Sequence, residues 1–207
     1  SGTDSYELCL VDAKIRYPKR KKIYAYEQSF HGRSFLALHT TYNPDKRIPF
    51  EVFKDLVTFL PFPDNDDFLK TKIEEPKEWL VLWENAKNKS FSLKLRNLEE
   101  KHSDDLLLQK EIQCLLKTKK AFEEELPLAL VIEPMQCEGG DRYASSRFFR
   151  ALRLLTRAFD VPLLVDEVQT FALGKKLFWF KEWKLQNSKG QEEFPEYVWC
   201  AKRSQCG

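Results

Sequence analysis

The sequence predicts an α/β fold in which a mostly parallel central sheet carries helices on both faces. Residues 128–133 (LALVIE) and 161–166 (VPLLVD) are near-continuous apolar runs, as expected of strands that are buried on both sides. Residues 145–159, between them, carry apolar side chains at helical spacing. These apolar positions are Phe148, Leu152, Leu155 and Phe159. Such strands alternating with an amphipathic helix indicate a parallel sheet.

The first quarter of the chain is predicted to form one helix followed by two short strands. Residues 4–16 have a helical pattern that opens on polar caps around Ser1, Thr3 and Asp4. Residues 22–27 (KIYAYE) and 34–41 (SFLALHTT) are short strand-like runs, with the polar segment QSFHGRS near their junction. Loops containing Pro and Asp are predicted at 43–49 and 61–67.

Residues 68–124 differ in composition from the rest of the chain. They are rich in Lys, Glu and Leu, and Leu108, Ile112, Leu115 and Phe122 recur at helical spacing. The stretch is therefore predicted to be helical, partly solvated and an elaboration on the core. A surface helical pair without chemistry is the simplest interpretation of it.

Composition excludes several classes of protein. The 207 residues include 34 Lys and Arg against 32 Asp and Glu, a net charge of +2 that gives no reason to expect nucleic acid or an acidic membrane as partner. No apolar run reaches the roughly 18 residues that span a bilayer. The five cysteines are widely spaced without a CxxC pair, which predicts reduced thiols in a cytoplasmic protein and no metal site.

The acids at Asp166 and Glu167 end the apolar strand VPLLVD and admit three interpretations. They could cap the next helix, or they could hold magnesium in a nucleotide hydrolase. The hydrolase needs a phosphate loop of the form GxxxxGK[ST], and the one Gly-Lys pair, Gly174-Lys175, lacks the upstream glycine. The third interpretation is a cofactor site, because ligands of such folds bind outside the carboxyl ends of the strands.

Pyridoxal chemistry requires a lysine, an anion at the ring nitrogen and a phosphate cup at a helix N-terminus. Ser1, Gly2 and Thr3 precede the first helix, and Phe30 and His31 lie in a loop where an aromatic ring could stack on a cofactor. Lys202 follows the apolar run YVWCA and so lies at another strand end. Each feature alone has an ordinary structural explanation, as a helix cap, as core packing or as a surface lysine.

Three ordered motifs make the interpretation specific. SFHGRS, IEPMQCEGGDR and VDEVQT resemble the class III aminotransferases, which depend on pyridoxal 5'-phosphate (PLP), and FHGRS with EGGDR and AKRSQCG is most similar to the lysine ε-aminotransferase group. The resemblance covers residues 1–207 apart from 68–124. It implies the large domain of PLP-dependent transferase fold type I, with the family's amino-terminal segment and small carboxyl-terminal domain lying outside this chain.

The resemblance also implies roles for individual residues. Gly2 and Thr3 would bind the phosphate, and Phe30, with His31 beside it, would contact the cofactor ring. Asp166 would pair with the ring nitrogen, Gln169 with the 3-hydroxyl oxygen, and Lys202 would be the Schiff-base lysine and proton shuttle. Arg33 and Glu138 would handle the substrate carboxylate, with the glutamate neutralising an arginine when lysine binds.

The implied reaction is a ping-pong transfer of the terminal amino group of L-lysine, or a similar amine, to 2-oxoglutarate in a homodimer. Other class III reactions remain open, namely ornithine or γ-aminobutyrate aminotransfer, an aminomutase or a decarboxylase, as does a truncated homologue without catalysis. The chain departs from the family at Cys137, where a glycine is usual, and at Phe171-Ala172-Leu173, where a glycine-rich turn is usual. These departures bear on efficiency and substrate choice more than on cofactor binding.

Overall fold

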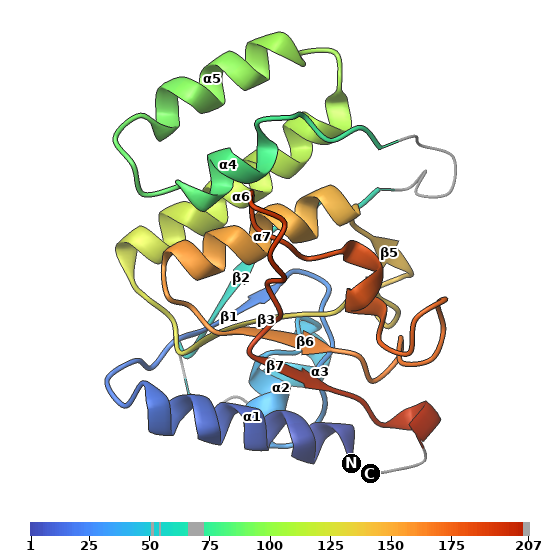
Figure 1. Cartoon of the computed structure of the whole chain (residues 1–207). Coiled ribbons are helices and arrows are strands. Elements are labelled where there is room, and N and C mark those ends of the chain that lie inside the picture. The colour runs from blue at the N-terminus through green and yellow to red at the C-terminus, as the bar shows by residue number, and fades with distance from the viewer. Residues whose placement is uncertain (51, 54, 66–72, 205–207) are drawn as a thin grey trace.

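A five-stranded parallel sheet forms the centre of the part of the chain that the structure describes. The structure is a computed structural model that describes all residues except 51, 54, 66–72 and 205–207. The strands lie in the order β2-β1-β3-β6-β7 and every pair is parallel (Figure 1). Their bounds are β1 (Ile23–Tyr26), β2 (Val57–Leu60), β3 (Ala129–Ile132), β6 (Leu163–Asp166) and β7 (Tyr197–Trp199). The predicted parallel sheet and the strands within 128–133 and 161–166 are confirmed.

Helices cover both faces of this sheet, as the sequence predicts. Figure 1 shows α1 (Gly2–Arg16) and α2 (Phe35–His39) on one face, and α6 (Leu106–Glu124) and α7 (Ser146–Ala158) on the other. Alternate residues of β1 divide between two apolar cores, because successive side chains of a strand point to opposite faces. Ile23 and Ala25 pack in the core under α1, whereas Tyr24 and Tyr26 pack in the larger core under α6 and α7.

Helix α1 begins at a capping box. The Ser1 hydroxyl accepts a hydrogen bond from the Asp4 backbone N–H, and the Asp4 carboxylate accepts from the chain's first nitrogen at 2.6 Å. Tyr6, Leu10 and Ala13 recur at helical spacing and are buried against the sheet. This helix carries the first residues of the chain to the edge of the sheet where the strands end.

Helix α7 connects β3 to β6 and confirms the amphipathic segment predicted at 145–159. Its N-cap is Ser145, whose hydroxyl accepts from the Phe148 backbone N–H at 3.1 Å. The chain leaves the helix through Asp160, which has a φ of 55°, and enters β6 directly. A strand, a helix and a second parallel strand follow one another here, as their apolar patterns indicate.

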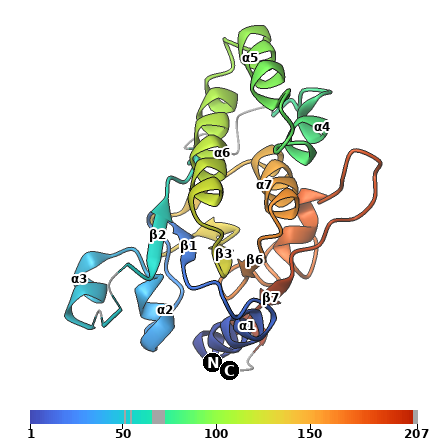
Figure 2. The same cartoon turned by 90° about the vertical axis from the view of Figure 1, so that its left-hand side faces the viewer.

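Within residues 68–124 the structure places α4 (Trp79–Glu84), α5 (Phe91–Lys101) and α6, which confirms the predicted helical character where the residues are described. Helix α6 packs on the sheet, with Leu108, Ile112 and Phe122 buried in the larger core. Helix α6 therefore belongs to the layer that covers this face of the sheet. Only α4 and α5 extend beyond the layer formed by α6 and α7 (Figure 2).

The strand predicted at 34–41 is wrong, because this segment forms helix α2. Glu7 of α1 explains the difference: its side chain accepts from the Leu36 and Ala37 backbone N–H groups at 2.9 and 3.1 Å. A carboxylate from a distant helix thus caps the first turn of α2, and the local pattern contains no sign of it. The predicted loop at 43–49 also contains short helical turns, α3 (Pro44–Arg47) and η1 (Ile48–Phe50).

Further elements were not predicted from the sequence. Strand β2 lies just before the predicted loop at 61–67, and residues 66–72 of that loop and of the helical stretch fall outside the described residues. A small antiparallel pair, β4 (Met135–Gln136) and β5 (Arg142–Tyr143), follows β3. Two short helical turns, η2 (Trp179–Trp183) and η3 (Lys202–Ser204), flank β7. Among the described helices, none is long and apolar enough to cross a membrane.

Candidate active site

A cavity of about 430 Å³ lies where the parallel strands end. Loops that follow parallel strands gather at the same edge of the sheet, so residues far apart in the sequence meet there. The start of α1, the loop after β1 and the ends of β3, β6 and β7 all contribute to the wall. The lining residues are Ser1, Gly2, Thr3, Phe30, His31, Gly32, Glu133, Asp166, Val168, Gln169, Ala201 and Lys202. All seven predicted cofactor residues, including Asp166 and Lys202, are among them.

Asp166 and His31 form a buried pair at this cavity. His31 Nδ1 lies 2.8 Å from Asp166 Oδ2, and the two side chains are 0% and 5% exposed. The second carboxylate oxygen, Oδ1, accepts from the Val168 backbone N–H at 3.0 Å. These contacts fix the orientation of the carboxylate. On the other side of the imidazole ring, the buried Nε2 atom has no hydrogen-bond partner within the described residues.

Glu133 is a buried acid of the same cavity that the predicted site does not include. It ends the strand predicted at 128–133, so its position at the sheet edge was the signal available in the sequence. Its carboxylate accepts from the Phe30 backbone N–H at 3.0 Å, which holds the loop that carries Phe30 and His31. Burial, and then the charge of Asp166, raise the pKa of Glu133 well above its usual range.

The start of α1 packs so closely against the cavity wall that two positions require glycine. A Cβ atom on Gly2 would lie 2.6 Å from Val168 Cγ2, and one on Gly32 would lie 2.4 Å from Thr3 Oγ1. Gly32 also has a φ of +131°, which side chains rarely tolerate. The backbone at the N-terminus of α1 therefore faces the cavity at close range, where an anion would meet its free N–H groups.

Lys202 begins η3, separated from β7 by two residues, and lines the same cavity as the acids. Its ammonium group lowers the pKa of Glu133, against the stronger raising effects of burial and Asp166. Within the described residues no hydrogen bond or ion pair occupies its side chain. The cavity therefore combines one lysine with two buried acids, and the lysine remains available to a ligand.

Arg33 and Glu138, the predicted substrate residues, lie outside this cavity. Glu138 is exposed and lies 3.8 Å from Lys46, measured from Oε2 to Nζ. Lys46 in turn sits 5.1 Å above the Phe30 ring, which forms part of the cavity wall. Arg33 and Lys46 together line a neighbouring cavity of about 520 Å³. Lys46 thus connects Phe30, Glu138 and Arg33, and no sequence motif pointed to it.

The positions at which the chain departs from the family motifs lie in the turn after β6 and in the β4–β5 hairpin. Glu167 is buried, and its carboxylate accepts from the Thr170 hydroxyl at 2.7 Å and the Phe180 backbone N–H at 2.8 Å. These bonds hold η2 against the end of β6, and Ala172 adopts a φ of 58° within the turn between them. Cys137 is half-buried in the β4–β5 hairpin, and burial raises the pKa of its thiol to about 11.

Comparison with known proteins decides the family. The sequence profile of the family described as aminotransferase class-III matches residues 1–185. The chain belongs to the class-III aminotransferase family. Relatives and solved structures agree with this assignment and show how much of a whole aminotransferase the chain represents.

Two relatives are 4-aminobutyrate aminotransferases. The enzyme of Emericella nidulans is 30% identical over 187 residues, which cover 88% of this chain and 30% of the relative. The enzyme of Dictyostelium discoideum is 32% identical over 190 residues, again covering 88% of this chain and 30% of the relative. The chain therefore spans about 30% of the length of the curated relatives it matches.

The fold is that of solved aminotransferases. The lysine aminotransferase from M. tuberculosis superposes with a TM-score of 0.71 at 22% identity, over 99% of this chain and 41% of that chain. The chain thus has the large-domain architecture of PLP-dependent fold type I, as the motifs implied. This likeness concerns the fold.

Class-III aminotransferases use pyridoxal phosphate, and the cavity residues of this class-III chain fit that cofactor. An oriented carboxylate, an unoccupied lysine and a half-buried aromatic ring line one space beside the N-terminus of a helix. The buried Nε2 atom of His31 has no hydrogen-bond partner among the described residues, and a polar group of a ligand could supply one. The close approach at Gly2 and Gly32 leaves backbone, rather than side chains, at the position suited to a phosphate.

Proposed function

We propose that this chain forms the cofactor-binding core of an aminotransferase that moves the terminal amino group of L-lysine, or a similar amine, to 2-oxoglutarate. The observation that carries the proposal is the shared cavity of Lys202 and Asp166 in a chain of the class-III family. Pyridoxal phosphate, when bound, supplies an electron sink that makes the carbon next to the amino nitrogen acidic.

The residues of the chain would divide the remaining work. Asp166 provides the negative charge that keeps a ring nitrogen protonated, and His31 holds this carboxylate in place. Lys202 would take the proton from the carbon next to the amino nitrogen and would return a proton at a second carbon. It is the lysine that lines the cavity in the described part of the chain. Phe30 would stack on the cofactor ring, and the Gln169 amide would donate a hydrogen bond to the 3-hydroxyl oxygen of that ring.

The phosphate end would be held by the start of α1. Gly2 and Thr3 offer backbone N–H groups and a hydroxyl at a helix N-terminus, where the helix dipole favours an anion. The Ser1–Asp4 capping box keeps this end of the helix formed. The two glycines allow the backbone to approach the cavity without a side chain in the way.

Replacement of Lys202 tests the assignment directly. In Lys202→Ala the amine is gone, so the protein should lose the cofactor's absorbance near the visible edge, and its turnover should fall by about 10²–10⁴-fold. Lys189→Ala, which removes an exposed lysine in a loop, serves as the control. If the purified protein shows no such band with added pyridoxal phosphate, or if Lys202→Ala retains it, the proposed role of Lys202 is wrong.

The donor is proposed from Glu138, Lys46 and Arg33, which lie outside the cavity on the side of Phe30. Glu138 offers a carboxylate to a cationic donor such as lysine, and Lys46 can neutralise it when a dicarboxylate binds instead. A second candidate donor is 4-aminobutyrate, because the relatives named above carry that name and because Arg33 and Lys46 offer two cations to a carboxylate.

Release of glutamate separates these donors. The protein loaded with cofactor would be mixed with 2-oxoglutarate and, in turn, with L-lysine, L-ornithine or 4-aminobutyrate. Glutamate formed with lysine supports the first proposal, and glutamate formed with 4-aminobutyrate alone supports the second. If none of the three donors yields glutamate while the substrate is rearranged or decarboxylated, the reaction is not the proposed amino transfer.

We also propose that two copies of the chain pair through the face covered by α1 and α2. Leu8, Val11 and Ile15 form an apolar stripe along α1 and are 68%, 52% and 73% exposed. Further exposed apolar side chains belong to α2 and to the segment that follows it, namely Phe35, Ile48, Phe50, Val52 and Phe53. Exposed apolar surface of this extent favours a protein interface.

A further inference from the structure

A groove of about 470 Å³ between α4 and α5 lies apart from the proposed active site. Figure 1 places α5 at the opposite end of the molecule from the N-terminus, which lines the cofactor cavity. The groove residues are Lys77, Glu78, Val81, Leu82, Lys94, Asn97, Leu98 and Lys101. Its volume is within the range of small-molecule sites. None of these residues takes part in the function proposed above.

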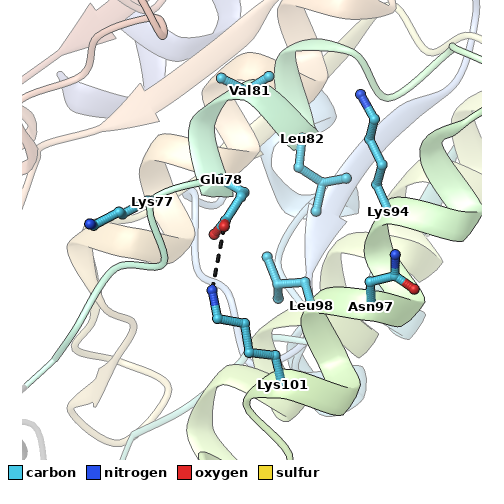
Figure 3. Close-up of a pocket in the computed structure, with 8 residues that line it drawn as sticks. All are labelled: Lys77, Glu78, Val81, Leu82, Lys94, Asn97, Leu98 and Lys101. Atoms are coloured by element: carbon cyan, nitrogen blue, oxygen red, sulfur yellow. Dashed lines mark hydrogen bonds and ion pairs between the residues drawn. The ribbon is translucent and has the colours of Figure 1, made fainter.

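The floor of the groove is apolar and firmly supported. Figure 3 shows the Leu82 and Leu98 side chains pointing into the space between the two helices, with Val81 above them. Behind this floor the Trp83 ring packs against Trp79 and Phe91, with ring centroids 5.5 and 5.3 Å apart. Both tryptophans are fully buried, so the two helices are held apart by a packed aromatic cluster.

The rim of the groove carries an excess of positive charge. Glu78 is the one acid among the lining residues, and Lys101 already neutralises it with an Nζ–Oε1 distance of 3.4 Å. Lys94 and Asn97 lie toward the other end of the groove (Figure 3). Within the described residues, neither of these two side chains has a hydrogen-bond or ion-pair partner. The groove therefore offers a free cation and an amide beside an apolar floor.

The size of the apolar floor selects among anionic partners. Lys94 and Lys101 are seven residues apart on α5, so the groove is about 10 Å long along that helix. An amphipathic partner helix would require anchoring pockets at i, i+3, i+4 and i+7, and the floor offers three apolar side chains. A single flexible hydrocarbon chain needs only a continuous apolar strip.

We propose that this groove binds a carboxylate carrying one unbranched medium-length hydrocarbon chain. Lys94 and Asn97 bind the carboxylate, and the chain lies over Leu98, Leu82 and Val81 toward the Glu78–Lys101 pair. The carboxylate gains a charge-assisted hydrogen bond, and the chain removes apolar surface of both partners from water. This binding is separate from the proposed amino transfer and does not depend on it.

Binding of a dansyl-labelled undecanoate to the purified chain tests the proposal. Trp79 and Trp83 lie behind the groove and should transfer excitation energy to the bound label in a saturable manner. Unlabelled decanoate should displace the probe, whereas decyltrimethylammonium, which has a cationic head, should not. Added probe should leave the absorbance of bound pyridoxal phosphate unchanged, which distinguishes this site from the cofactor cavity.

Charge reversal on α5 provides the matched comparison. Lys94→Glu should weaken binding of the probe at least about tenfold, because an attractive charge becomes a repulsive one. Arg96→Glu makes the same charge change on an exposed residue of the same helix that does not line the groove, and should change binding less than twofold. The proposal is overturned if the probe does not bind saturably, if the cationic amphiphile competes equally, or if both variants weaken binding alike.

Discussion

Asp166 enters the cofactor cavity with both carboxylate oxygens already engaged. Oδ2 pairs with His31 Nδ1, and Oδ1 accepts from the Val168 backbone N–H. A side chain fixed in this way loses little conformational freedom when a ligand binds, which favours a strong and well-aligned interaction. The Nε2 atom of His31 is buried without a hydrogen-bond partner within the described residues, so it remains available for a hydrogen bond with a ligand.

Asp166→Asn should therefore disturb the site even before a cofactor binds. An amide has one acceptor oxygen, so its NH₂ group would face either the His31 N–H or the Val168 N–H. One donor would be left unsatisfied at a cost of about 1–3 kcal/mol. Urea unfolding of the cofactor-free protein measures this loss, and exposed Asp104→Asn is the control. Equal stability of the two variants would contradict the pairing.

Glu133 should make the stability of the protein depend on pH. Burial and the charge of Asp166 raise the pKa of Glu133, so the folded protein keeps its proton at pH values where the unfolded chain, with a carboxyl pKa of about 4.3, has lost it. The folded state then binds more protons, and the contribution of Glu133 to stability falls as pH rises toward its folded pKa.

Glu133→Gln removes the titratable carboxyl group and keeps an oxygen that can accept a hydrogen bond from the Phe30 N–H. We expect the stability of Glu133→Gln relative to the natural chain to increase from pH 5 to pH 7.5. Denaturant midpoints of the cofactor-free proteins at several pH values provide the measurement. Glu100→Gln, at an exposed position of α5 whose charge does not act on Glu133, should run parallel to the natural chain. Parallel curves for Glu133→Gln as well would show that this residue is ionised throughout.

At the scale of elements, Arg147 joins α7 to α6 and to the segment before α4. Its Nε donates to Glu111 Oε2 at 2.7 Å, and its Nη1 donates to Asp105 Oδ2 at 2.9 Å and to the Glu74 carbonyl at 2.6 Å. The Arg147 and Glu111 side chains are 1% and 0% exposed. Two charges removed from water in this way stabilise the fold only as long as each keeps its partner.

Removal of Arg147 alone should be strongly destabilising. Arg147→Met leaves Glu111 buried and uncompensated, at an expected cost of about 3–5 kcal/mol at neutral pH. The double variant Arg147→Met/Glu111→Leu should recover much of that loss. Arg157→Met is the control on the same helix, because its pair with Glu193 is largely exposed on the arginine side and contributes at most about 1 kcal/mol. Additive losses in the double variant would exclude the coupling.

Helices and strands that have a clear local residue pattern were predictable from the sequence. Residues 128–133, 145–159 and 161–166 combine length, periodicity and capping, and each forms the expected strand or helix. Helix α2 was not predictable, because its first turn is capped by Glu7 from another helix. Strand β2 is four residues long and is defined by pairing with β1 rather than by its own composition.

Some residues of the candidate site were likewise predictable from the sequence, and others were not. Asp166, Lys202 and the start of α1 follow strands or open a helix, and the order of the motifs indicated that they would meet. Glu133 was not predicted as a site residue, because an acid at a strand end has several ordinary roles. Lys46 was not predictable from the sequence, because its place above Phe30 depends on how the short turns after α2 fold back. Such positions require the three-dimensional structure.

At the scale of the whole molecule, the apolar stripe of α1 should control self-association. We expect the natural chain to be a dimer in solution and Leu8→Glu/Ile15→Glu to be a monomer, because buried charge without a partner disfavours an interface. Sedimentation velocity at several concentrations measures the difference. Leu106→Glu is the control, since Leu106 is 80% exposed at the start of α6, on the opposite face. A monomeric natural chain would contradict the proposed interface.

The cofactor cavity joins the first residues of the chain to nearly the last ones. Ser1, Gly2 and Thr3 line it together with Ala201 and Lys202, and Tyr6 of α1 stacks on Trp199 of β7 with ring centroids 4.9 Å apart. During synthesis, α1 leaves the ribosome long before its partner strand exists. A contact between residues so far apart in the sequence forms slowly, and the apolar face of α1 stays exposed meanwhile. The cavity is therefore complete only after β7 has been synthesised, and a nascent chain that stops before β7 lacks the wall formed by Ala201 and Lys202.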